Sequence, residues 1–243
     1  MNLRAFNTNK KNNMSLLDDL KSKISAYATE KYVVEETEIV PATDYSKLTF
    51  GNKGLVCEFA FLFVDIRKSS KLHETYGHVT AAKIYQSFHE INVRVIEANN
   101  GSVRAFDGDR VMGVFAGNTK RSNAVKAAMQ IQWAVRNILN PTLKKPILCG
   151  AGIDFGETLV TKVGKGRNTE NNDLVWVGKA SNYASHLSNE ASNSTIISIS
   201  TFNGMLEDRK KSNGRDMWTL KTITLKNDTK IQCYESAWGW EIS

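Results

Sequence analysis

The ten residues CEFAFLFVDI (57–66) decide the fold of this chain. Apolar and aromatic residues dominate a short run that ends beside a carboxylate, Asp65, which predicts one buried β-strand. A helix is predicted downstream, because apolar residues recur at intervals of four, three and four: Ile84, Phe88, Ile91 and Val95. The Asn-Asn-Gly run at 99–101 is expected to end that helix.

A hairpin, a second helix and another strand follow. SVRAF (102–106) and RVMGVF (110–115) flank Asp107, Gly108 and Asp109, and an Asp-Gly pair between β-like runs predicts a tight hairpin turn. The second helix is expected to stop before Pro141 and to present one apolar face: Ala128, Ile131, Val135 and Ile138. The strand ILCGAGIDFG (147–156) comes next. The order β-α-β-β-α-β predicts a ferredoxin-like α+β fold, an antiparallel sheet with helices on one face.

The flanking segments extend this core. Residues 1–13, rich in Asn and Lys, are expected to be a disordered leader, with Met14 as an alternative start. Residues 14–54 predict an amphipathic helix, then an edge strand YVVEETEIVP (32–41) and a turn between Gly51 and Gly54. Residues 55–243 are expected to form one folded domain. Beyond the core it should contain a polar loop, a strand, a helix, a strand and a terminal hairpin: 163–172, LVWVG (174–178), from Lys179, TIISIS (195–200), and through Trp218 and Tyr234.

The composition is that of a globular protein. The chain has 243 residues, 41% hydrophobic and 23% charged, which suits one large domain. No apolar run approaches the roughly 18 residues of a membrane span, and the longest, 55–66, is interrupted by Glu58 and Asp65. Because the start is polar and basic, without an apolar signal region, we expect a cytoplasmic protein with no membrane partner.

Cysteine usage and net charge narrow the function classes further. Cys57, Cys149 and Cys233 are far apart in strand-like text, so we expect buried thiols and neither a disulfide framework nor a zinc site. The formal charge of +7 suits nucleic acid or a polyphosphate substrate. The basic residues are spread along the chain, however, so charge alone does not favour a nucleic-acid binder.

Two aspartates and one turn are the candidate chemistry. Asp65 ends the first core strand and Asp109 follows the hairpin turn; since these strands lie side by side in a β-α-β-β unit, both carboxylates can reach one sheet edge. Paired carboxylates suit Mg²⁺ or Mn²⁺, and two such ions about 3.5–4 Å apart can activate an attacking oxygen and neutralise a leaving group. Each aspartate alone could be only a helix cap or a solvated turn residue. The turn between the first core strand and the following helix is expected to bind phosphates through Ile66, Arg67, Lys68, Ser69 and Ser70.

Four ordered blocks then carry a resemblance: FLFVDIRKSSKLHETYG (61–77), VRAFDGDRVMGVF (103–115), GAGIDFGETLVTKVG (150–164) and VWVGKASNYASHL (175–187). They resemble the signature blocks of class III nucleotide cyclases. The resemblance implies that Asp65, Asp109 and the carbonyl of Ile66 bind two Mn²⁺ or Mg²⁺ ions and that Asn182 orients the ribose. It also implies a head-to-tail homodimer, in which one subunit supplies the metals and the other supplies the asparagine.

Three positions depart from that family. Ala105 stands where the family's adenylate cyclases carry a base-selecting Lys and its guanylate cyclases a Glu, and Val175 stands where an Asp or Cys partner is expected. His186, four residues after Asn182, replaces the family's transition-state Arg. A neutral imidazole lacks that permanent charge, so either His186 acts protonated, or structurally only, or another cation substitutes; the candidates are Arg104, Lys226 and Lys230.

Because the purine-selecting residues are absent at positions 105 and 175, the chain looks most like the pyrimidine cyclases of the Pycsar anti-phage systems. That resemblance implies cyclic UMP or cyclic CMP as product, sensed by a separate effector protein, and it favours UTP over CTP as substrate. Arg104 could donate to a pyrimidine carbonyl, and Trp176 could stack on the base or simply fill the core.

Three alternatives remain open from the residues. A purine cyclase with an unusual base pocket shares the reaction, and a degenerate cyclase that only binds nucleotides shares the fold. A ferredoxin-like RNA-binding domain would explain sheet aromatics and positive charge, but it gains little from carboxylates at a sheet edge. What activates the enzyme is not encoded in any recognisable motif.

Overall fold

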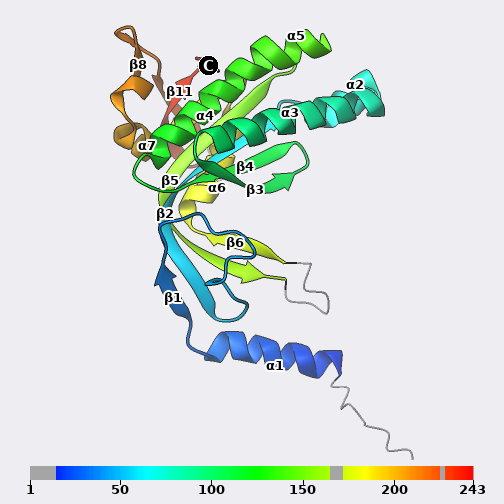
Figure 1. Ribbon diagram of the computed structural model, residues 1–243, viewed down its shortest axis with the longest axis vertical. Helices are drawn as coiled ribbons and strands as arrows, with labels where there is room; N and C mark the ends of the chain where they lie inside the picture. The colour runs from blue at the N-terminus through cyan, green and yellow to red at the C-terminus, as the bar shows by residue number, and fades with distance from the viewer. Residues whose placement is uncertain (1–14, 165–171, 225–227, 243) are drawn as a thin grey trace, which may run out of the picture.

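One large sheet forms the frame of the molecule. The computed structural model describes residues 15–164, 172–224 and 228–242. Within them, the sheet has the strand order β10-β11-β7-β5-β2-β4-β3, with β1 beside β2 and β6 beside β5 (Figure 1). Its strands are β1 Val33–Glu36, β2 Lys53–Ile66, β3 Gly101–Asp107, β4 Arg110–Phe115, β5 Cys149–Val163, β6 Asp173–Val177, β7 Ser194–Ser198, β10 Thr219–Thr224 and β11 Lys230–Ser236. A separate two-stranded ribbon pairs β8 (Lys211–Ser212) with β9 (Arg215–Asp216).

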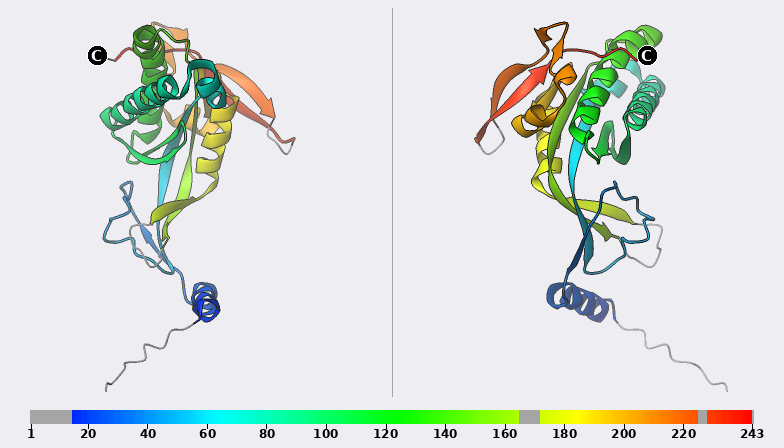
Figure 2. Two further views of the ribbon diagram at one scale, coloured as in Figure 1. Left: turned by 90° about the vertical axis from the view of Figure 1, so that its right-hand side faces the viewer. Right: turned by 60° about the vertical axis from the view of Figure 1, so that its left-hand side comes forward.

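The predicted ferredoxin-like core is confirmed. Strands β5, β2, β4 and β3 lie in that order and each pairs antiparallel with its neighbour. Helices α3 (His78–Ala98) and α4 (Lys120–Ala134) cover one face, while α6 (Lys179–Glu190) covers the other (Figure 2). The remaining helical segments are α1 Leu16–Thr29, α2 Leu72–Tyr76, α5 Asn140–Leu143, α7 Ile199–Gly204 and the 3₁₀ turns Ser69–Lys71 and Glu207–Arg209.

Burial on both faces explains why β2 reads as a nearly continuous apolar run. Ala60, Leu62 and Val64 pack in the cluster beneath α3 and α4, whereas Phe59 and Phe61 pack in the cluster beneath α6. A strand between two layers needs apolar residues at every position and loses the alternation of a half-exposed strand. The stretch that predicts the fold is therefore the strand at its centre.

Several boundaries differ from the sequence expectation. The first edge strand ends at Glu36 and does not reach Pro41. The second helix does not stop before Pro141: it continues through a π-helical segment, Val135–Leu139, into α5, where Pro141 occupies the first turn. Proline has no N–H to donate, and a π-helical segment is one of the irregularities found where the regular hydrogen-bond ladder of a helix is interrupted. Widening the helix also rotates its apolar face, so that Ile138 is 46% exposed.

Other expectations concern the chain ends and the loops. The strand predicted through Ser200 ends at Ser198, whose hydroxyl instead caps α7 by accepting from the Thr201 N–H at 3.2 Å. The predicted leader (1–13), Met14 and most of the loop 163–172 lie outside the described residues. Cys149 and Cys233 are buried, as expected, whereas Cys57 is only half-buried. None of the described helices combines the length and the apolar content that crossing a bilayer requires.

Helix α6 lies directly on the backbone of β5. A Cβ added at Gly152 would clash with the Ser188 nitrogen and the Ala184 oxygen, both in the backbone of α6. Only a residue without a side chain permits this approach, and such contacts cannot be relieved by rotating a neighbouring side chain. The position of α6 therefore depends on glycine at this position and also at Gly150, where an added Cβ would meet the carbonyl oxygens of Ala191 and Ser188.

Replacing Gly152 tests that dependence. Gly152→Ala should lower the free energy of unfolding by about 1–3 kcal/mol, because α6 must shift away from the sheet. Gly156→Ala is the matched control on the same strand, since a Cβ there would meet the nearest atom, Ala180 Cβ, at an ordinary 3.4 Å. Urea unfolding measures both. Equal losses in the two variants would contradict the close approach.

Candidate active site

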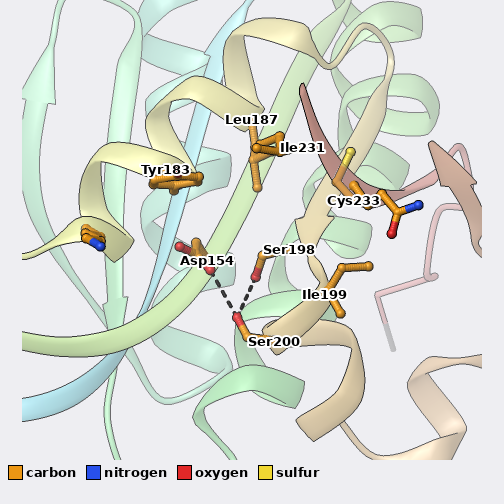
Figure 3. Close-up of a pocket in the computed structure, with 10 residues that line it drawn as sticks. Asp154, Tyr183, Leu187, Ser198, Ile199, Ser200, Ile231 and Cys233 are labelled. Atoms are coloured by element: carbon orange, nitrogen blue, oxygen red, sulfur yellow. Dashed lines mark hydrogen bonds between the residues drawn. The ribbon is translucent and has the colours of Figure 1, made fainter. Parts of the chain in front are cut away.

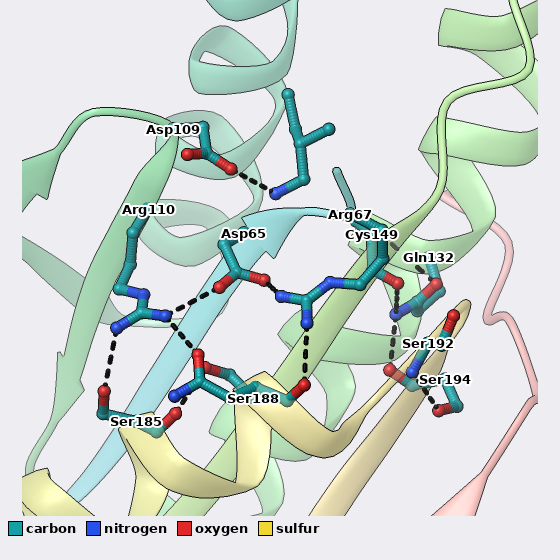
Figure 4. A network of polar contacts seen from close by, with 12 residues as sticks. Asp65, Arg67, Asp109, Arg110, Gln132, Cys149, Ser185, Ser188, Ser192 and Ser194 are labelled. Carbon is teal, nitrogen blue, oxygen red and sulfur yellow. Dashed lines mark hydrogen bonds and ion pairs between the residues drawn. The ribbon is translucent and has the colours of Figure 1, made fainter. Parts of the chain in front are cut away.

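The end of β2 brings two carboxylates to one edge of the sheet. The last β2–β4 pair is Val64 with Val111, so the hairpin turn lies beside the final residues of β2. Asp109 accepts a hydrogen bond from the Ile66 N–H through Oδ2 at 2.7 Å, and Asp65, 6% exposed, is the preceding residue (Figure 4). The β2–β4 pairing therefore places Asp65, Ile66 and Asp109 side by side.

Helix α3 holds the turn that carries Asp109. Gly108 has a φ of 61°, which a side chain would strain. Its carbonyl contacts His89 Nε2 at 3.0 Å, and the His89 ring packs edge-on against Phe106 with the centroids 5.2 Å apart. The turn is anchored to α3 on one side, which limits how far Asp109 can move.

Two arginines contact Asp65. Arg67 Nη2 forms an ion pair with Oδ1, and Arg110 Nη2 forms one with Oδ2 at 2.8 Å. Arg110 also donates to the Ser185 hydroxyl at 3.0 Å and to the Asn189 side-chain oxygen, and Arg67 donates to the Asn189 carbonyl at 2.9 Å (Figure 4). Sequence reasoning missed Arg110, Ser185 and Asn189. The available signal was the hairpin register, which puts the residue after Asp109 opposite Asp65.

The donor set suits a hard divalent cation. Asp65 and Asp109 offer carboxylate oxygens and Ile66 a carbonyl, the ligand types that Mg²⁺ and Mn²⁺ prefer. Within the described parts of the chain, no three His, Cys, Asp or Glu side chains gather into a metal cluster. An ion here would therefore complete its coordination with water or substrate phosphate oxygens, as Mg²⁺ commonly does beside one or two carboxylates. The residues fit the expected metal.

The turn after Ile66 presents cations more than backbone amides. The Arg67 N–H donates to the Leu148 carbonyl at 2.8 Å, and Lys68 has a φ of 58° before the short 3₁₀ turn that contains Ser69 and Ser70. A cavity of about 350 Å³ beside the turn is lined by Arg67, Lys68 and Lys71, among others. Burial lowers the pKa of Arg67, but a guanidinium remains charged at neutral pH.

A β-bulge sets Arg104 apart from its neighbours. The β3–β4 register shifts between Val103 and Ala105, so Arg104 is the extra residue, and bulges commonly re-aim a side chain. Its Nη2 contacts the Val40 carbonyl at 3.4 Å, while its Nε is buried without a partner among the described residues. Ala105 borders the cluster beneath α6.

Val175 and Trp176 lie on opposite sides of β6. Trp176 packs edge-on against Phe59 and Phe61, with ring centroids 5.5 and 5.7 Å away. This packing agrees with the interpretation that Trp176 fills the core. Val175 is 42% exposed. Because successive side chains alternate across a strand, these two residues cannot line the same surface.

The candidate residues on α6, Asn182 and His186, lie on the side of the helix that faces away from the sheet. Asn182 is exposed and His186 half-buried, whereas Ala184 and Leu187 are buried. In the described part of the chain, neither Asn182 nor His186 bonds to Asp65 or Asp109. Lys230 is exposed at the start of β11, and Lys226 lies outside the described residues.

A second cavity lies beside α6, next to Lys179, Tyr183 and Leu187. It measures about 300 Å³ and includes Asp154, Lys179 and Tyr183 in its lining (Figure 3). The Asp154 carboxylate is 8% exposed and accepts from the Ser200 hydroxyl at 3.3 Å. Burial raises the pKa of this carboxyl above its ordinary value of 3.8, despite hydrogen bonds that act in the other direction.

Solved structures place the fold in a known class. The chain resembles a crystal structure of a guanylyl cyclase with a TM-score of 0.64 and 18% identity, covering 77% of this chain and 95% of that one. It also resembles the adenylyl cyclase CyaB from P. aeruginosa with a TM-score of 0.64 and 19% identity, covering 75% and 95%. The fold is therefore that of a class III nucleotide cyclase catalytic domain, as the signature blocks predict.

Curated relatives identify the family within that class. The chain is 35% identical to a uridylate cyclase from Xanthomonas perforans over 237 residues, 94% of this chain and 100% of the relative. It is 33% identical to a uridylate cyclase from Burkholderia cepacia, with the same coverage of 94% and 100%. No family model matches the chain. The chain belongs to the uridylate cyclase family, and it is a nucleotide cyclase.

The buried carboxyl of Asp154 predicts a pH-dependent stability. A carboxyl whose pKa is raised on folding contributes stability that is complete below its ordinary pKa of 3.8 and is lost as the pH rises through the raised value. Asp154→Asn removes that loss, so we expect its melting temperature at pH 7.5 to exceed the wild-type value by about 2–4 °C. The gain should shrink as the pH falls toward the ordinary pKa.

Thermal unfolding at several pH values measures this effect. Asp216→Asn is the control, because the Asp216 side chain is 74% exposed and should show no such trend. A melting temperature of Asp154→Asn below wild type at every pH would contradict the prediction.

Proposed function

We propose that this protein cyclises a pyrimidine nucleoside triphosphate, UTP in preference to CTP, to the 3′,5′-cyclic monophosphate and pyrophosphate. The observation that carries the proposal is the pair of carboxylates, Asp65 and Asp109, on either side of the Ile66 backbone in a member of the uridylate cyclase family. We assign the reaction to residues 55–243, with residues 14–54 as an N-terminal extension.

In this reaction the ribose 3′-oxygen attacks the α-phosphorus in line. The new 3′-O–P bond forms as the bond to the β-phosphate oxygen breaks; the hydroxyl proton leaves to solvent and pyrophosphate departs. Two divalent ions, Mn²⁺ or Mg²⁺, held by Asp65, Asp109 and the Ile66 carbonyl, would supply activation of the hydroxyl and neutralisation of the leaving group. Arg67 and Lys68, which line the adjacent cavity, would bind the phosphates, with Ser69 and Ser70 nearby.

Arg104 is our choice for reading the base. Its guanidinium has five donors and contacts only the carbonyls of Val103 and Val40 in the described residues, which leaves its buried Nε without a partner. A pyrimidine carbonyl is a matching acceptor. Ala105 and Val175 would leave space at the two positions that select purines in related cyclases, and Trp176 would support the pocket wall from the core.

The active site is completed by a second subunit in our proposal. Asn182 and His186 lie on the outward side of α6 and contact neither carboxylate in the described chain, so they are free to face a partner. In a head-to-tail homodimer, Asn182 would orient the ribose bound at the other subunit's carboxylates. His186 in its protonated form, or Lys226 or Lys230, would contribute the cation that stabilises the transition state.

We further propose that the cyclic nucleotide is a second messenger in anti-phage defence, sensed by a separate effector protein. This role rests on the resemblance of the signature blocks to those of Pycsar cyclases.

Substrate choice is tested by incubating the protein with each of the four NTPs and Mn²⁺ and identifying the product by mass spectrometry. We expect cyclic UMP to dominate. Arg104→Ala should lower kcat/KM for UTP at least tenfold, because a hydrogen bond to a buried polar group is lost. Arg94→Ala is the control, since the Arg94 side chain is 79% exposed on α3. A cyclic purine as the main product would refute the pyrimidine assignment.

Shared active sites are tested by mixing two inactive subunits. Asp109→Asn and Asn182→Ala should each abolish most activity as homodimers. When they are co-expressed, each mixed dimer retains one intact site, with carboxylates from one subunit and the asparagine from the other. Activity should therefore return to about half of wild type per purified mixed dimer. No recovery in such dimers would contradict the head-to-tail arrangement.

A further inference from the structure

Asp65 forms ion pairs with two arginines, one in the turn after β2 and one at the start of β4. Its two oxygens contact Arg67 and Arg110, and both arginines also bond to α6, at Asn189 and, for Arg110, at Ser185. The side chains of Asp65 and Arg110 are 9% and 26% exposed. A carboxylate this buried requires compensation, because an unpaired buried charge is costly.

Arg110 connects β2 to α6 most directly. Its planar guanidinium donates at the same time to Asp65 on β2 and to two residues on the last turns of α6 (Figure 4). The fixed fork of an arginine can serve several acceptors in one plane, which an ammonium cannot do with the same geometry. Arg110 itself begins β4, immediately after Asp109.

We propose that Arg110 is a positioning residue with two separable effects: its charge competes with divalent cations for Asp65, and its fork fixes α6, which carries Asn182 and His186. This inference rests on the proposed function, since it takes Asp65 as a metal ligand. A guanidinium and a divalent cation at the same carboxylate oxygen are attracted by the same negative charge and repel each other at short range. Binding of one at that oxygen must weaken binding of the other.

The charges around Asp65 make the competition strong. Two carboxylates, Asp65 and Asp109, are matched by two guanidinium groups, Arg67 and Arg110. Without substrate the pocket therefore has little net negative charge to attract a cation. The phosphates of a nucleoside triphosphate add negative charge and accept hydrogen bonds from arginine. Nucleotide and cation should consequently strengthen each other's binding, and this coupling is reciprocal.

Arg110 also connects the two roles of α6, which are its attachment to its own subunit and its presentation of Asn182. The helix bonds to its own subunit's Asp65 through Arg110 and presents Asn182 on its outward side. Release of the Arg110 fork would remove the bonds to the Ser185 and Asn189 side chains, while the Gly152 contact and the Arg67 bond to the Asn189 carbonyl keep the helix on the sheet. Arg110 therefore affects the placement of catalytic side chains that it does not touch.

The test measures Mn²⁺ binding to the full-length protein without nucleotide, by electron paramagnetic resonance of free Mn²⁺. Arg110→Gln should bind Mn²⁺ about tenfold more tightly than wild type, because a competing unit charge is removed next to Asp65. Arg110→Lys keeps the charge and should stay within about twofold of wild type. Arg94→Gln is the exposed-arginine control and Asp65→Asn should abolish the site.

A second readout separates the fork from the charge. Arg110→Lys and Ser185→Ala should each lower kcat at least fivefold with little change in KM, because α6 loses a bond while Asp65 keeps a cationic neighbour. A residue with only a structural role would weaken Mn²⁺ binding or leave it unchanged, so tightening in Arg110→Gln is the discriminating result. If Arg110→Gln does not fold, unchanged kcat in both Arg110→Lys and Ser185→Ala overturns the proposal.

Failure of this inference differs from failure of the proposed function. If Asp65→Asn abolishes Mn²⁺ binding while Arg110→Gln binds as wild type does, the competition is wrong and the metal assignment stands. If wild type and Asp65→Asn bind Mn²⁺ equally, Asp65 is not a metal ligand and both fall.

Discussion

The compensation of one buried carboxylate organises the active end of this protein. Asp65 ends a strand that is covered on both faces, so its charge lies at the boundary between the core and the catalytic surface. Two guanidinium groups neutralise it. Those arginines also reach α6, and the ion pairs thus connect the sheet edge to the helix that carries Asn182. A site built this way couples charge balance to geometry, since any new cation must enter an arrangement that is already satisfied.

Close backbone packing supports that arrangement from beneath. Gly152 lets α6 approach β5 without an intervening side chain, which sets the height of the helix above the sheet. The arginine contacts then fix its C-terminal turns, and the side of the helix away from the sheet, which carries Asn182, remains exposed. In a head-to-tail dimer, one helix would therefore be anchored by its own subunit's carboxylate while it serves the partner's substrate. Such a dimer would have a physical route by which its two sites influence each other.

The region proposed to read the base illustrates a different principle. Specificity for a small base can arise from side chains that leave space, as at Ala105, and from one donor held ready by the fold. The β3 bulge re-aims Arg104 toward the segment around Val40, so residues outside the ferredoxin-like core help to place it. Trp176, in contrast, packs edge-on against Phe59 and Phe61 and belongs to the core beneath α6.

The sequence by itself determined the strand order, the position of Asp65 at a strand end and the Asp-Gly turn before Asp109, because these follow from local apolar periodicity and turn chemistry. Its signature blocks also placed the chain among class III cyclases. Only the tertiary structure decided that Arg110 bonds to Asp65 and α6, that a bulge re-aims Arg104, and that the second helix continues past Pro141. The hairpin register could have placed Arg110 opposite Asp65. The bonds of Arg110 to α6, the bulge and the course of the second helix depend on the packing of segments distant in the chain, which no local pattern of residues encodes.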